Sequence, residues 1–136
     1  MATYNKFQPW VDAMVEVAQM ATDQLVLALT TNANIPVVTN GVLADLTVIS
    51  YTNLSSRNVT TSSSSQSGGT YSLVVADLVL TASGAVATFR HVVTYDDTPT
   101  SPADPLICWH DYGGDVTLAS GETFTYDAGA NLFTVA

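Results

Sequence analysis

The chain has 136 residues, of which 47% are hydrophobic and only 11% are charged, and its formal net charge is −9. Nucleic-acid binding depends on neutralising phosphates with Lys and Arg, so three basic residues against twelve acidic ones argue against DNA, RNA and anionic membranes as ligands. A chain of this length suits one domain, and we expect residues 1–136 to form a single β-rich domain.

The first expected element is an α-helix over about residues 9–21. Pro9 suits the first helical position, and polar residues recur at helical spacing along one stripe that holds Asp12, Glu16, Gln19 and Asp23. The remaining surface is apolar and includes Trp10, Val11, Met14 and Val17. We expect this helix either to cover the β core of its own subunit or to insert against a neighbouring subunit.

The next segments alternate between strand and turn composition. Residues 24–30 read as a buried strand, residues 31–41 as a loop, residues 42–45 as one helical turn and residues 46–51 as a second strand. Residues 52–70 are rich in Ser and Thr and poor in apolar side chains, so little burial offsets the entropy of ordering them. This segment is expected to be a mobile loop or the tip of a long hairpin.

The remainder of the chain has the pattern of an antiparallel β unit, in which short apolar runs are bounded by Gly, Pro, Asp and Asn. Strands are predicted at residues 71–81, 85–95, 106–112, 116–118, 122–126 and 132–135. Neither face of the strand at residues 106–112 is plainly polar, so we expect it to be covered on both sides. The predicted fold is mainly β, an antiparallel β-sandwich or barrel-like domain with one N-terminal α-helix.

The sequence contains none of the common catalytic or metal-binding motifs, such as HExxH, paired CxxC, a P-loop or GxSxG. We therefore predict no catalytic residues, no cofactor and no metal, and we expect Cys108 to be a small buried hydrophobe. Two alternatives remain open: a small hydrolase built on His110 and Asp111, and a calcium-binding turn at residues 111–115. No leader or apolar run of ~20 residues is apparent, so we expect folding in a cytosol.

Several stretches resemble small virion structural proteins of tailed bacteriophages. The resemblance rests on PLICWHDYGG at residues 105–114, VTL at residues 116–118 and SGETFTYD at residues 120–127. Residues 2–7, 40–45, 74–77 and 95–98 also resemble that family. The chain departs from the family pattern at Cys108, at the inserted His110 and in the expanded Ser run near Ser62.

The resemblance implies a capsid decoration, or cement, protein. Such a protein would be synthesised in the cytoplasm of a bacterial host and would then bind the outer surface of the capsid. Its partners would be the major capsid protein and other copies of itself, with a homotrimer at local threefold positions as one arrangement. The candidate interface residues are Trp10, Val11, Met14, Val17, Trp109 and Tyr112. The alternatives are a tail or head-fibre module that binds a receptor or glycan through Trp109, Tyr112 and the Ser-rich segment, and another virion structural subunit.

Overall fold

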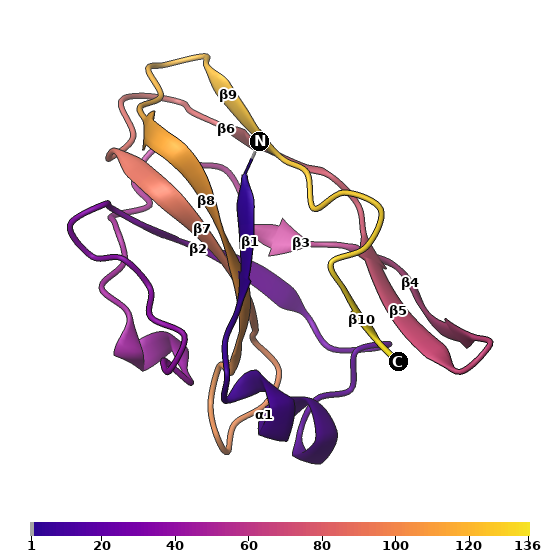
Figure 1. Ribbon diagram of the computed structural model, residues 1–136. Coiled ribbons are helices and arrows are strands. Elements are labelled where there is room, and N and C mark those ends of the chain that lie inside the picture. The colour runs from indigo at the N-terminus through magenta and orange to yellow at the C-terminus, as the bar shows by residue number, and fades with distance from the viewer. Residues whose placement is uncertain (1) are drawn as a thin grey trace.

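The computed structural model describes residues 2–136 and confirms a mainly β, antiparallel fold with one α-helix near the N-terminus (Figure 1). The elements in chain order are β1 (Thr3–Lys6), α1 (Trp10–Glu16), β2 (Leu25–Thr30), the 3-10 helix η1 (Leu43–Asp45), β3 (Asn58–Val59), β4 (Thr61–Ser67), β5 (Thr70–Val75), β6 (Leu78–Thr81), β7 (Phe89–Asp96), β8 (Leu106–Val116), β9 (Thr123–Tyr126) and β10 (Phe133–Val135).

Three antiparallel sheets make up the fold. The largest has five strands in the order β1-β8-β7-β2-β3, a second has three strands in the order β10-β5-β4, and β6 pairs with β9 in a two-stranded sheet. All six residues of β2 are buried, as its nearly continuous apolar sequence predicts. The sheets are open rather than closed into a barrel, so both β1 and β10 are edge strands.

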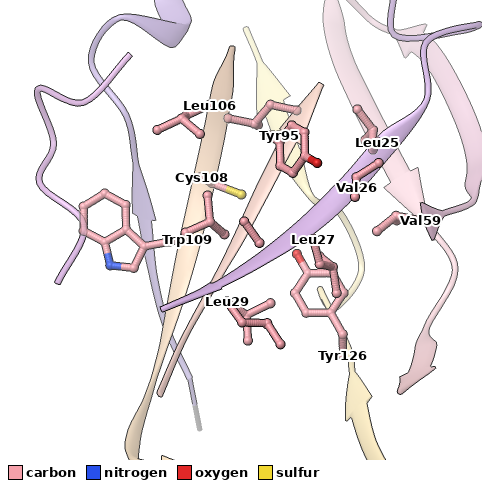
Figure 2. Packing of buried hydrophobic residues seen from close by; sticks show 14 of the residues in the cluster. Leu25, Val26, Leu27, Leu29, Val59, Tyr95, Leu106, Cys108, Trp109 and Tyr126 are labelled. Atoms are coloured by element: carbon pink, nitrogen blue, oxygen red, sulfur yellow. The ribbon is translucent and has the colours of Figure 1, made fainter. Parts of the chain in front are cut away.

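Strand β8 is covered on both faces, as its sequence predicts. Figure 2 shows Cys108 and Trp109 projecting from opposite sides of this strand, and both side chains are buried. On the Cys108 side, the Tyr126 hydroxyl of β9 hydrogen-bonds the Thr94 hydroxyl of β7 at 2.8 Å. On the other side, Trp109 packs against Phe7 with ring centroids 4.6 Å apart. Trp109 therefore belongs to the core of this chain.

The strand predicted over residues 71–81 is interrupted at Ala76 and Asp77 and forms two strands, β5 and β6. Strand β5 pairs with β4 and β10, whereas β6 pairs with β9, so the chain passes from one sheet to another at the interruption. Asp77 is exposed there, which agrees with its place as a break in the apolar alternation.

The helix is shorter than predicted, because α1 ends at Glu16 rather than near residue 21. Val17 leaves the helical region with φ −128°, and a separate turn follows in which the Asp23 carboxylate accepts a hydrogen bond from Gln19 N at 2.8 Å. Gln19 and Asp23 have the spacing of the polar stripe, but both lie beyond the end of the helix. Their hydrogen bonds to one another stabilise the turn instead.

Of the two arrangements expected for the Ser-rich segment, the hairpin is the one observed, because residues 61–67 form strand β4 and pair with β5 instead of forming a loop. Gly68 and Gly69 supply the positive φ angles, 59° and 84°, of the tight turn into β5. Strand β4 lies at the edge of its sheet, where backbone pairing with β5 orders the serines without burying them. One side-chain contact adds to this pairing, since Ser64 and Tyr71 share a hydrogen bond of 2.7 Å between their hydroxyl groups.

Residues 46–51 do not form the predicted strand, although they lie along the edge of β2. Ile49 N donates to Leu29 O at 3.0 Å, but Leu29 N donates to the Tyr51 hydroxyl at 3.2 Å instead of to a backbone carbonyl. The Tyr51 hydroxyl thus accepts the hydrogen bond that a backbone carbonyl would accept in a regular ladder, and residues 46–51 remain irregular. The helical turn expected at residues 42–45 is present as η1.

Strand β8 is longer than predicted, because it continues through Gly113 and Gly114 to Val116. The register with β7 shifts within this stretch, because Phe89 pairs with Val116 but His91 pairs with Asp111. The step between these two pairs is two residues along β7 and five residues along β8. The two glycines make such a bulge possible, and Gly113 has φ +76°. The expected turn at residues 111–115 is therefore a bulge within a continuous strand.

Candidate binding groove

A groove of about 990 Å³ is lined by residues of β1, α1 and the C-terminal segment that contains β10. The side chains of Tyr4, Lys6, Trp10, Val11, Met14, His110, Asp127, Leu132, Phe133 and Val135 are among those that line it. Its walls come from opposite ends of the sequence, so the groove exists only in the folded chain.

Helix α1 forms one wall because of how its apolar residues are divided between core and surface. Trp10 and Ala13 are buried, and the Trp10 ring meets Phe133 of β10 in an edge-on contact with centroids 5.9 Å apart. The two valines on the outer side, Val11 and Val15, are 46% and 78% exposed. The helix therefore covers the core of its own chain and also presents apolar side chains to solvent.

A smaller hollow of about 360 Å³ lies beside the groove and shares Met14 and Val135 with it. Its other lining residues are Val15, Ala18, Met20, Ser64 and Tyr71. Because the two hollows meet at Met14 and Val135, apolar surface is continuous from the groove across α1 to the β4–β5 hairpin. Exposed apolar surface of this kind, rimmed by polar residues, is typical of protein interaction sites.

Strand β1 contributes an unpaired backbone edge to the groove. Phe7 N donates to Ile107 O at 3.2 Å, so Phe7 belongs to the set of residues whose backbone groups point toward β8. Because this orientation alternates along an antiparallel strand, the N–H and C=O groups of Tyr4 and Lys6 point away from β8. The side chains of the same two residues line the groove.

The lining of the groove holds one acidic and one basic side chain, Asp127 and Lys6. Asp12 and Glu16 are exposed on α1 but are not among the lining residues. The chain's other basic side chains, Arg57 and Arg90, are held by their own partners.

Those two arginines are engaged within the chain. The Arg57 guanidinium lies 3.6 Å from the centroid of the Tyr51 ring and also donates to Leu27 O. The Arg90 guanidinium pairs with the Asp111 carboxylate at 2.8 Å. Neither arginine lines the groove, so neither adds positive charge to its lining.

His110 lies in the lining of the groove, between two tyrosine rings. The centroids of Tyr4 and Tyr126 each lie 5.5 Å from that of His110, both in edge-on geometry. Burial lowers the pKa of the His110 imidazole, because the charged form loses solvation. The neutral ring therefore behaves as an aromatic packing group at neutral pH.

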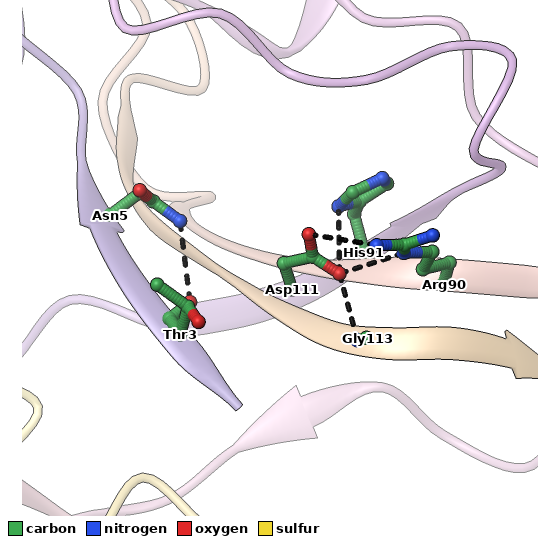
Figure 3. A network of polar contacts seen from close by, with 6 residues as sticks. All are labelled: Thr3, Asn5, Arg90, His91, Asp111 and Gly113. Atoms are coloured by element: carbon green, nitrogen blue, oxygen red, sulfur yellow. Dashed lines mark hydrogen bonds and ion pairs between the residues drawn. The ribbon is translucent and has the colours of Figure 1, made fainter. Parts of the chain in front are cut away.

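Asp111 follows His110 directly in β8, so its side chain projects from the opposite face of the sheet. Figure 3 shows the Asp111 carboxylate meeting Arg90, His91 and the backbone N–H of Gly113. Hydrogen bonds from Arg90 and Gly113 hold the pKa of this carboxyl below its usual value. The two residues of the hydrolase hypothesis thus do not act on one another.

Cys108 is fully buried, and burial raises the pKa of its thiol to about 12. A thiol with so high a pKa is not a nucleophile at neutral pH, because the reactive species is the thiolate. Within residues 2–136, no group of three or more His, Cys, Asp or Glu side chains is arranged to hold a metal ion. Over the same residues, no helix has the length and apolar character needed to cross a membrane.

Comparisons with protein families, curated proteins and solved structures found no match for this chain.

The structure brings only some of the predicted interface residues together. Trp10, Val11 and Met14 line the groove, and Val17 is partly buried just beyond the end of α1. Trp109 is buried on the opposite face of β8, and the partly buried Tyr112 packs edge-on against Phe124 with centroids 4.9 Å apart.

Sequence reasoning missed Tyr4, Phe133 and Val135 as residues of the same surface. Strand β1 has only four residues, Thr3–Lys6, and Tyr4 is the one with a large apolar side chain, so no periodic pattern marks it as a strand. The contact between β10 and α1 joins distant parts of the chain, and no local pattern reports it.

Proposed function

We propose that this chain is a non-enzymatic virion structural protein, and specifically a capsid decoration protein that binds the outer head surface and stabilises the shell. The observation that carries the proposal is the apolar groove between β1, α1 and β10, with the exposed Val11 on its helical wall and an unpaired strand edge. This surface is suited to binding another protein chain.

The side chains that were candidates for catalysis support a binding role instead. His110 and Asp111 face opposite sides of β8, and the raised pKa of Cys108 leaves its thiol protonated. A hydrolase needs its nucleophile and base within hydrogen-bonding reach of one another. These three residues do not meet that requirement.

Charge supports a position on the outside of the head. A net charge of −9 is repelled by packaged DNA, which favours the outer over the inner surface of a capsid. With only 11% charged residues, much of the surface can be covered by neighbouring subunits without desolvating many ions. The proposed partners are the major capsid protein and other copies of this chain.

The structure weakens one of the alternatives. A receptor- or glycan-binding module of a tail or head fibre was expected to use Trp109 as a stacking platform, but Trp109 is 6% exposed and packs on Phe7. A sugar could not reach the face of this ring without displacing the core. Another kind of virion subunit would use the same apolar groove and differs only in its location.

The proposal is tested by cosedimentation of the purified protein with shells of the major capsid protein that lack it. We expect saturable binding that Val11→Lys weakens by about tenfold or more, because Val11 lines the groove and a central apolar contact in an interface contributes on the order of 1–2 kcal/mol. Val79→Lys is the matched control, since Val79 is 50% exposed on β6 and does not line the groove. Absence of binding by the unmodified protein would contradict the proposal.

A further inference from the structure

We infer that the groove binds an extended, basic segment of the partner protein, which adds as a strand to the free edge of β1. The inference rests on the proposed function for the identity of the partner as a capsid protein, but the mode of binding is argued from the groove alone.

The backbone of β1 supplies the pairing sites for such a strand. Tyr4 and Lys6 point their N–H and C=O groups away from β8, while β8 satisfies the opposite edge of β1 from Thr3 to Lys6. An unpaired edge is a template for another strand, and main-chain hydrogen bonds then supply affinity. Four residues of β1 are long enough to pair a short segment of the partner.

The walls of the groove supply side-chain contacts for the same strand. In an added strand, alternate side chains would point into the groove, where Trp10, Met14 and Phe133 form an apolar lining. The groove volume of about 990 Å³ is at the upper end of small-ligand pockets, which suits several side chains rather than one. The hollow beyond Met14 extends the apolar surface further.

The net charge of the chain favours a basic partner. Asp127 and Lys6 are the charged side chains that line the groove, so the lining holds one charge of each sign, whereas the whole chain carries a net charge of −9. A second copy of this chain would bring a net charge of −9 to the contact, so like charges would oppose pairing through β1. Lys or Arg side chains of an added strand would instead be attracted by the net negative charge of the chain.

The test uses the full chain and three synthetic peptides of one length. One alternates Val and Lys, the second alternates Val and Glu, and the third repeats the Val–Lys sequence with N-methylated backbone nitrogens. We expect the Val–Lys peptide to shift the amide NMR signals of Tyr4 and Lys6 and to slow their hydrogen exchange. The Val–Glu and N-methylated peptides should bind about tenfold more weakly or not at all, because they lack the charge or the backbone donors.

Two variants of Lys6 separate the backbone from the side chain. Lys6→Pro removes the outward N–H, whereas Lys6→Ala removes only the charged side chain; thermal unfolding of both verifies that each one folds. The inference predicts weaker peptide binding by Lys6→Pro than by Lys6→Ala. Equal binding of the three peptides, no binding, or shifts confined to residues outside the groove would overturn it.

The same variants distinguish this inference from the proposed function. Shell binding that is equal in Lys6→Pro and Lys6→Ala, with unchanged exchange of the Tyr4 and Lys6 amides, would leave the decoration role standing and overturn strand addition. Selective binding of the Val–Lys peptide without any binding to shells would support strand addition and contradict the decoration role.

Discussion

The hydroxyl groups of Thr94 on β7 and Tyr126 on β9 lie 2.8 Å apart in the core and share a hydrogen bond. Both residues are fully buried. The bond links the five-stranded sheet to the two-stranded sheet, in a region that is otherwise filled by apolar side chains. A buried hydroxyl that loses its partner pays the cost of desolvation without compensation, so this pair makes the packing of the two sheets specific.

Tyr126→Phe should lower the free energy of unfolding by about 1–2 kcal/mol, because it leaves the Thr94 hydroxyl without this partner. Thr94→Val combined with Tyr126→Phe removes both hydroxyls and should cost less than the sum of the two single changes. Urea unfolding of the four proteins measures the coupling. Strict additivity would show that the hydroxyl pair contributes nothing of its own.

The Asp96 carboxyl at the end of β7 should make stability depend on pH. It is buried, and burial together with the facing Asp23 carboxyl raises its pKa to about 7. In the unfolded chain this group ionises near pH 4, whereas the folded chain holds the proton until about pH 7. The folded state therefore binds more protons between these values, and the free energy of unfolding falls as pH rises through this range.

Asp96→Asn should remove this dependence and raise the free energy of unfolding at pH 8 by on the order of 1–3 kcal/mol, with a much smaller gain at pH 5. Asn keeps the oxygen that accepts a hydrogen bond from Thr98 N and offers the Asp23 carboxylate a donor. The neighbouring, exposed Asp97 provides the control variant, Asp97→Asn. An equal effect of the two substitutions at pH 8 would indicate that general charge reduction, not the buried carboxyl, is responsible.

The antiparallel β class and most strand positions followed from local patterns. Residues 24–30 are a nearly continuous apolar run and contain the buried strand β2, and the short runs between glycines near the C-terminus contain β9 and β10. The serines of β4 could not be assigned to a strand in this way, because backbone pairing with β5, and not side-chain burial, holds them in an extended conformation. The end of α1 was misplaced because Gln19 and Asp23 share the helix spacing but bond to one another in a turn.

The groove was only half predictable. Trp10, Val11 and Met14 stood out as an apolar helical surface, whereas Phe133 and Val135 reach the same place through the pairing of β10 with β5. The burial of Trp109 could not be predicted, because an aromatic residue in a strand gives the same sequence pattern whether it packs in the core or at an interface.

Cys108 should be inert toward thiol reagents in the folded protein. Its side chain has no solvent exposure, and burial raises the pKa of the thiol to about 12, so almost no thiolate is present at pH 8. Labelling with a maleimide should be slow in buffer and rapid and complete in urea. Native labelling at the rate of an exposed thiol would mean that the region around β8 opens readily.

The ion pair between Arg90 and Asp111 should contribute little to stability, although it is well formed at 2.8 Å. Both side chains are more than a quarter exposed, and solvent screens such pairs. A double-mutant cycle with Arg90→Gln and Asp111→Asn should give a coupling energy below about 1 kcal/mol that shrinks as salt is added. A larger, salt-insensitive coupling would show that the pair is shielded by a partner or by the bulge in β8.

The central claim, that the chain decorates the outside of a viral head, is tested most directly by cryo-electron microscopy of the virion that carries it. The account predicts density on the outer head surface that fits this fold, with α1, β1 and β10 directed toward the capsid shell. Density confined to the tail or fibres, or no density for this chain on the head, would contradict it.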